Sequence, residues 1–175
     1  MTRFCAWRQT ESEILAQGDV LRDVEIPLLT RDWTTSEDLA IAPSLLIVLS
    51  QSCDLEPSNN GVRAKNVMCC PMHTIPDWEL KNPKTVGQWK SIAQGKVAGV
   101  HLVPPFVSVA PRESWVCDFR SPTSLPYDYL MDIFQTKGFS RWRLQSPFVE
   151  ALSSTFGDLF ARVALPTSPL SAPRW

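Results

Sequence analysis

The chain has 175 residues, of which 44% are hydrophobic and 20% charged, and its formal net charge is −1. This length allows about one domain with a sizeable core, and the composition excludes a disordered protein. The nearly balanced charge gives no overall field that attracts nucleic acid, and no apolar stretch reaches the roughly 18 residues that a membrane-spanning helix needs. We therefore expect one globular domain over 1–165, a proline-rich tail over 166–175 and no membrane segment.

The cysteines and the first residues indicate the compartment. There are five cysteines, an odd number with two adjacent members, which argues against the disulfide framework of a secreted protein and favours reduced thiols. The first seven residues are followed by polar residues rather than by an apolar signal segment. We expect a cytoplasmic protein.

Short strands are predicted along most of the chain, because 15 prolines and 7 glycines are typical of short elements joined by proline turns. Leu45–Leu49 is apolar on both faces, as in a central, covered strand. Pro57–Gly61 is a turn signal, so the next apolar run should return antiparallel and form a hairpin over 45–70. The expected strands are 19–26, 45–50, 65–70, 100–103, 114–119 and 141–144.

Two helices are predicted after the hairpin. An insertion over about 74–98 is rich in lysine and contains a short surface helix over 85–94, with Thr85 as its cap. The second helix starts at Ser146 and Pro147, the preferred residues for a cap and a first helical position. Its apolar face should close the core, with large side chains at spacings of three and four: Phe148, Leu152, Phe156, Leu159, Phe160 and Val163.

Three segments resemble a known family: Gln17–Val20, Leu46–Ser50 and Val67–Pro71 are similar to the Gly-Asp, Val-Val-Leu-Ser and Val-Pro segments of the MazF and PemK endoribonuclease toxins. The resemblance covers roughly the first 70 residues and implies an SH3-like barrel. In these toxins an arginine and a threonine flank the scissile phosphate, and the matching positions here are Ser44 and His73. The arginine, the group best suited to the transition state, is thus replaced.

A second resemblance concerns the Ser-Gln-Ser-Cys-Asp-Leu segment at 50–55. Together with Ser124–Tyr129 and Arg143–Phe148, it is similar to uncharacterised bacterial proteins with a Ser-Gln-x-Cys-Asp-Leu signature, which bring no function with them. We expect an α+β fold that is mainly β. Its body is a small antiparallel SH3-like barrel or a strongly bent sheet, with the C-terminal helix packed on it.

Cys53 and Asp54 directly follow the central strand, where catalytic groups often lie. A thiolate nucleophile needs a nearby histidine, and Cys53, Asp54 and His101 form the candidate catalytic set. The alternative is structural, with Cys53 as a small buried hydrophobe and Asp54 as a turn residue.

A metal site is the third reading of the cysteines. Cys70 and His73 have Cys-x2-His spacing, and the hairpin would bring Cys53 near them. However, there is no second pair of ligands at zinc spacing, so Cys69 and Cys70 are read as ordinary strand residues. We expect neither a metal nor a cofactor.

The aromatic residues favour binding over catalysis, because seven tryptophans is a high number for this length and tryptophan is enriched at interfaces. The candidate binding residues are Ser50, Gln51, His73, Trp78 and Trp89. The lysines around the last two would suit single-stranded nucleic acid, or else form a solvated face.

We predict a bacterial recognition or partner-binding component of a toxin–antitoxin or phage-defence type of system, a setting that the resemblance alone implies. A protein partner or a second copy of the chain is expected, and the net charge gives no support to nucleic acid. The alternatives are a cysteine-dependent hydrolase and a MazF-like endoribonuclease, so the sequence leaves open whether the protein is an enzyme.

Overall fold

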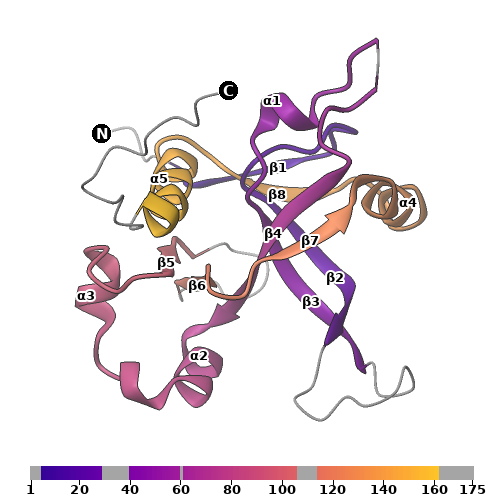
Figure 1. Cartoon of the computed structure of the whole chain (residues 1–175). Helices are drawn as coiled ribbons and strands as arrows, with labels where there is room; N and C mark the ends of the chain where they lie inside the picture. The colour runs from indigo at the N-terminus through magenta and orange to yellow at the C-terminus, as the bar shows by residue number, and fades with distance from the viewer. Residues whose placement is uncertain (1–4, 29–39, 60, 106–113, 162–175) are drawn as a thin grey trace, which may run out of the picture.

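The computed structural model describes residues 5–28, 40–59, 61–105 and 114–161, and these residues form an α+β fold built on an antiparallel sheet (Figure 1). The strands of the described chain are β1 (Trp7–Thr10), β2 (Asp19–Leu28), β3 (Ala40–Val48), β4 (Asn66–Thr74), β5 (Val100–Val103), β6 (Trp115–Asp118), β7 (Thr123–Pro126) and β8 (Arg141–Leu144). The helices are α1 (Ser52–Leu55), α2 (Ile75–Lys81), the 3-10 turn η2 (Pro83–Thr85), α3 (Trp89–Ala93), α4 (Tyr127–Lys137) and α5 (Phe148–Ala161).

The strand order is β1-β8-β2-β3-β4-β6-β5, with β7 also paired to β4. All pairs are antiparallel, and the first half of β4 pairs with β7 while its second half pairs with β6. The sheet therefore divides at β4. Among the described strands, β1 and β5 end the order without pairing to each other, so the sheet does not close.

The central strand is β3, as its sequence predicts. Leu46, Ile47 and Val48 are each 0% exposed, so both faces of the strand are covered. Ile47 belongs to a core cluster that includes Leu152 of α5, whereas Leu46 and Val48 belong to a cluster that includes Leu130 of α4. Because successive side chains of a strand point to opposite faces, α5 and α4 cover opposite faces of the sheet (Figure 1).

The insertion has a small core of its own. Trp78 of α2 and Ile92 of α3 pack on Val100 and Val116 of β5 and β6. The expected short helix over 85–94 is confirmed only in part: α3 covers Trp89–Ala93 with Gln88 at its N-terminal cap, whereas Thr85, the expected cap, ends the η2 turn. Gly87 has a φ of +77° within this segment, a left-handed conformation that a helix does not continue through.

Most expected strands are confirmed, with ends that differ by a few residues. β1 and β7 were not predicted, because neither has a run of apolar residues, and α2 and α4 were not predicted either. The C-terminal helix is present, but its apolar face is not fully buried: Leu152 is 0% exposed and Phe160 is 57% exposed. Val163 and the tail over 166–175 lie outside the described residues. None of the described helices is long and apolar enough to cross a membrane.

Candidate functional sites

The Ser-Gln-Ser-Cys-Asp-Leu segment leaves β3 and forms α1, and most of its side chains make structural contacts. Ser50 Oγ accepts a hydrogen bond from the Met68 backbone N–H at 2.8 Å. Ser52 Oγ accepts one from the Gln17 N–H at 3.1 Å, and Leu55 is fully buried. Gln51, another candidate for binding, accepts a contact from the Cys53 thiol at 3.7 Å. The segment joins the end of the central strand to its neighbours.

The structure does not bring Cys53, Asp54 and His101 together. Cys53 is exposed on α1, and Asp54 pairs with Arg63 at 3.2 Å. His101 lies on β5, which joins the sheet through β6 at the second half of β4, whereas α1 follows the β3 end that pairs with the first half of β4. Figure 1 shows α1 and β5 well apart. The structural alternative is wrong on one point as well, because it expects a buried Cys53 and the Cys53 thiol is exposed.

His101 has a structural environment. Its ring stacks on Phe119 with 6.0 Å between the centroids. Burial disfavours the charged imidazolium and lowers the pKa of His101 to about 4. The side chain is therefore a neutral packing group near neutral pH.

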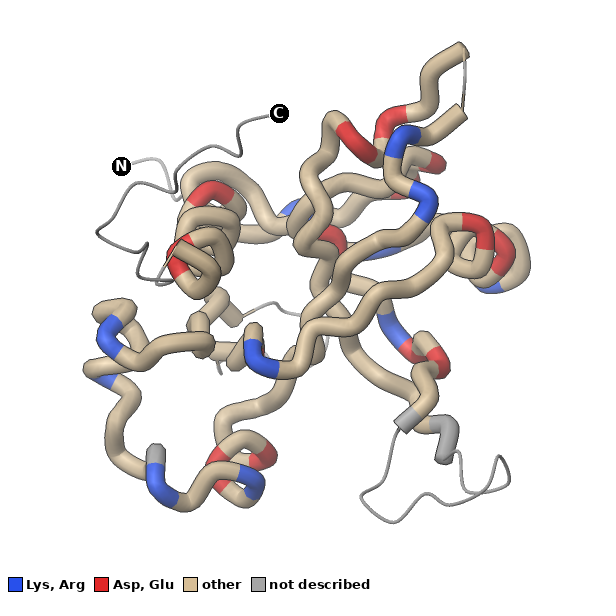
Figure 2. The backbone as a smooth tube through the Cα atoms, viewed as in Figure 1, with Lys and Arg blue, Asp and Glu red and all other residues tan. Residues whose placement is uncertain are grey.

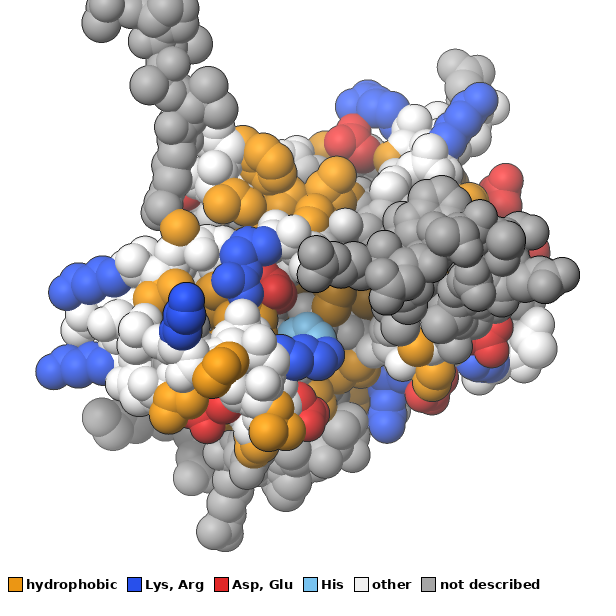
Figure 3. Space-filling model, turned by 60° about the horizontal axis from the view of Figure 1, so that its bottom comes forward, with side chains coloured by type: hydrophobic (Ala, Val, Ile, Leu, Met, Phe, Trp, Pro, Cys, Tyr) orange, Lys and Arg blue, Asp and Glu red, His pale blue; other side chains and the backbone are white. Residues whose placement is uncertain are grey.

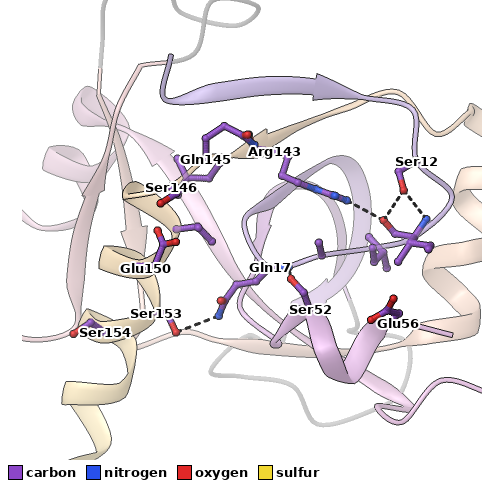
Figure 4. A pocket seen from close by; sticks show the side chains of 15 residues that line it. Ser12, Gln17, Ser52, Glu56, Arg143, Gln145, Ser146, Glu150, Ser153 and Ser154 are labelled. Carbon is purple, nitrogen blue, oxygen red and sulfur yellow. Dashed lines mark hydrogen bonds between the residues drawn. The ribbon is translucent and has the colours of Figure 1, made fainter. Parts of the chain in front are cut away.

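A pocket lies where three of the segments quoted from the sequence meet, and we call it the motif pocket (Figure 4). Its volume is about 840 Å³. The lining residues come from the loop before β2, from α1, from the β8–α5 junction and from the first half of α5: Ser12, Ile14, Leu15, Ala16, Gln17, Ser52, Glu56, Arg143, Leu144, Gln145, Ser146, Val149, Glu150, Ser153 and Ser154. Hydroxyl and amide groups dominate its polar surface.

A buried ion cluster holds the walls of the motif pocket. Asp19 is 0% exposed, and its carboxylate accepts hydrogen bonds from Arg141 Nε at 2.7 Å, from Arg143 Nε and Nη2, and from the Ala16 backbone N–H. Both arginines also donate to the Ile14 carbonyl, at 2.6 and 2.9 Å. The donors of the two arginines thereby fix the loop before β2 to β8.

A second hollow, which we call the His73 cleft, lies between the β3–β4 pair and α2. Its volume is about 550 Å³, and its polar lining comes from Ser44, His73, Lys81, Asn82, Asp118 and Ser121, beside apolar residues that include Met72 and Trp78. The space-filling view of this side shows a histidine at the bottom of a hollow with basic and acidic side chains around it (Figure 3).

The charges of the cleft are unevenly compensated. Asp118 receives Arg120 Nε at 2.8 Å on one oxygen and Arg120 Nη2 at 3.1 Å on the other. Lys81 makes no salt bridge with any described residue. Burial, and then the positive charge of Lys81, lower the pKa of His73 below its usual 6.5, although Asp118 and Asp77 oppose this shift. His73 is therefore neutral near pH 7, with a lysine beside it.

Two predicted binding residues, His73 and Trp78, meet in this cleft, with 6.1 Å between their ring centroids. Trp78 is 1% exposed, and the guanidinium of Arg120 lies 4.8 Å from the centre of its ring. No open face remains there for a stacked base. Trp89, on α3, donates its indole N–H to Glu79 at 2.8 Å and packs within the insertion.

The described residues contain no group of three or more histidine, cysteine or acidic side chains that would hold a metal ion. Cys69, Cys70 and Cys117 are fully buried. Burial raises the pKa of Cys69 to about 12, and burial beside Cys117 raises that of Cys70. These thiols are packing groups.

Comparison with protein families, with curated proteins and with solved structures finds no match to this chain.

Proposed function

We propose that this protein is a recognition protein whose His73 cleft binds an acidic segment of a protein partner. The observation that carries the proposal is the charge pattern of the cleft. Arg120 neutralises Asp118 through two oxygens, whereas Lys81 has no anionic partner among the described residues. The cleft thus keeps one positive charge beside neutral hydrogen-bonding groups, which suits a carboxylate.

The setting of this proposal is a bacterial, cytoplasmic toxin–antitoxin or phage-defence type of system, which rests on the resemblance to the MazF and PemK toxins. The division of the sheet at β4 into two ladders supports a strongly bent, SH3-like arrangement. The bacterial setting and the SH3-like arrangement are parts of the proposal. The charge pattern of the cleft supports binding of an acidic segment without them.

The test uses a hexaglutamate peptide and follows the His73 ring and the Trp78 indole by NMR. We expect saturable shifts, and Lys81→Gln should weaken binding roughly three- to tenfold, because it removes a charge-assisted contact. Lys84→Gln is the matched control, since Lys84 is an exposed lysine of the same insertion that does not line the cleft. Equal losses in both variants would show nonspecific attraction and exclude this site.

A second candidate is an endoribonuclease acting in the same cleft. It is favoured because Ser44 and His73, the positions that match the phosphate-flanking residues of the toxins, both line the cleft from neighbouring strands. Neutral His73 would accept a proton from a ribose hydroxyl, and Lys81 would stabilise the charge that develops on the phosphate. The three separated residues Cys53, Asp54 and His101 give no comparable support to a cysteine hydrolase.

Incubating purified protein with RNA separates the two candidates. The ribonuclease predicts fragments whose formation His73→Ala abolishes while Lys84→Gln leaves it unchanged. If RNA stays intact at high protein concentration while the hexaglutamate peptide binds, the recognition function stands alone.

A further inference from the structure

The motif pocket is a second site, distinct from the His73 cleft and absent from the proposed function. It is formed by chain segments that are distant in sequence, and it borders the Ser-Gln-Ser-Cys-Asp-Leu segment through Ser52 (Figure 4). At about 840 Å³ it has room for a side chain together with the main chain on either side of it.

The pocket is rigid before any ligand arrives. Gln17 Nε2 donates to the Leu49 carbonyl at 2.8 Å and reaches Ser153 Oγ at 3.4 Å, which fixes the amide in the pocket. The Asp19, Arg141 and Arg143 cluster clamps the carbonyls of Ser12 and Ile14. Walls fixed by hydrogen bonds lower the entropic cost of binding.

Much of the hydrogen-bonding capacity of the pocket is unused. Gln17 Oε1 accepts no hydrogen bond from any described residue. The hydroxyls of Ser146 and Ser154, which also line the pocket, form no hydrogen bond with any described residue either. Amide and hydroxyl groups offer both donors and acceptors, which matches the alternating N–H and C=O groups of a peptide main chain.

The charges of the pocket select a basic ligand. Asp19 pairs with both Arg141 and Arg143, so this cluster keeps one net positive charge, which the two glutamates of the lining outnumber. Glu56, the residue that caps the C-terminus of α1, and Glu150 on α5 make no salt bridge with any residue that the structure describes. In addition, the described part of α5 carries acidic residues and neither lysine nor arginine (Figure 2).

We propose that the motif pocket binds a basic residue, with its flanking main chain, in an extended segment of a protein partner. The cation pairs with Glu150 on the α5 side of the pocket, and the aliphatic stem of the side chain packs on Leu144 and Val149. The hydroxyl and amide groups pair with the main chain of the segment.

The experiment titrates the full-length protein with the capped peptide acetyl-Gly-Arg-Gly-amide and follows the side-chain amides of Gln17 and Gln145 by NMR. The peptide with citrulline in place of arginine has nearly the same shape and no charge. We expect saturable shifts with the arginine peptide and roughly threefold weaker binding of the citrulline peptide. Glu150→Gln should weaken the arginine peptide by a similar factor and leave the citrulline peptide unchanged.

Asp158→Asn is the matched control, because Asp158 is an exposed acid of the same helix that does not line the pocket. This variant should bind the arginine peptide as the unchanged protein does, and so should Lys81→Gln, which tests the other site. Equal binding of the two peptides, an equal loss in Asp158→Asn, or no saturable shift up to about 10 mM peptide would overturn the proposal.

Discussion

The motif pocket and the His73 cleft differ in what holds them together. The motif pocket is fixed by a buried carboxylate with two arginines, and its lining is mostly hydroxyl and amide groups. The cleft contains a half-buried histidine whose pKa is lowered, next to a lysine without an ion pair among the described residues. The first should therefore be a rigid site that pH near neutrality hardly affects, and the second a site whose charge changes with pH.

The largest expected effect concerns the ion cluster of the motif pocket. Asp19→Ala leaves Arg141 and Arg143 without their anion, and Arg141 is 4% exposed. An uncompensated buried charge costs about 3–5 kcal/mol, so the free energy of unfolding, measured with denaturant, should fall by that amount.

Asp54→Ala is the control for this loss. It also removes one carboxylate from an ion pair, but the pair with Arg63 is exposed, and its loss should cost about 0–1 kcal/mol. Similar costs for the two variants would mean that the cluster does not hold the pocket.

Gly18 tests how tightly the same pocket is built. Its φ is +83°, and an added Cβ would lie 3.0 Å from Leu144 Cβ and 3.1 Å from Val149 Cγ2. Gly61 has a φ of +85° and nothing within 4 Å of an added Cβ. Gly61→Ala should therefore cost about 1 kcal/mol for its backbone conformation, and Gly18→Ala about 1–2 kcal/mol more for the close contact.

Thermal and denaturant unfolding of the two glycine variants gives the difference directly. If they lose the same stability, Leu144 and Val149 move aside easily, and the pocket is softer than its hydrogen bonds indicate.

The fold was predictable where one strand or helix had a strong pattern of its own. Leu45–Leu49 reads as a covered strand because both of its faces are apolar, and the structure covers both. β1 has the sequence Trp-Arg-Gln-Thr, and it forms because β8 pairs with it at the sheet edge. Such a strand depends on a partner more than 130 residues away, and no local pattern reports it.

The candidate sites show the same limit. Gly18-Asp19 and Arg143 stood out in the sequence as parts of separate segments, but only the fold shows that they meet. His73 and Trp78 were predicted as binding residues and do share a cleft, whereas Lys81 and Asp118 were missed. Lys81 and Asp118 stand out only when it is known which charged side chains form ion pairs in the fold. The spacing of residues in the sequence does not show these pairs.

His101 gives an intermediate effect, expressed as a dependence of stability on pH. Its pKa is about 4 in the folded chain and near 6.5 when unfolded, so between these values the unfolded chain binds the proton and the folded chain does not. This contribution to stability is complete above pH 6.5 and is lost as the pH falls to 4. The loss should be about 1–3 kcal/mol after allowing for partial solvent exposure.

His101→Leu keeps an apolar contact with Phe119 and removes the titrating group. The stability difference between this variant and the unchanged protein should vary with pH between 4 and 6.5 and be constant above that range. A difference that stays constant throughout would show that His101 binds its proton equally well in both states.

The smallest expected effect separates the two hollows by pH. An acidic peptide in the His73 cleft favours the protonated histidine, whose pKa in the free protein is below 6.5. The affinity for hexaglutamate should therefore rise as the pH is lowered from 7.5 through that pKa, by roughly three- to tenfold, and His73→Gln should remove this rise. Binding of the arginine peptide should not strengthen over the same range, since no histidine is among the described residues that line the motif pocket. If the rise persists in His73→Gln, the net charge of the protein controls it, and the contrast between a rigid and a titrating site fails.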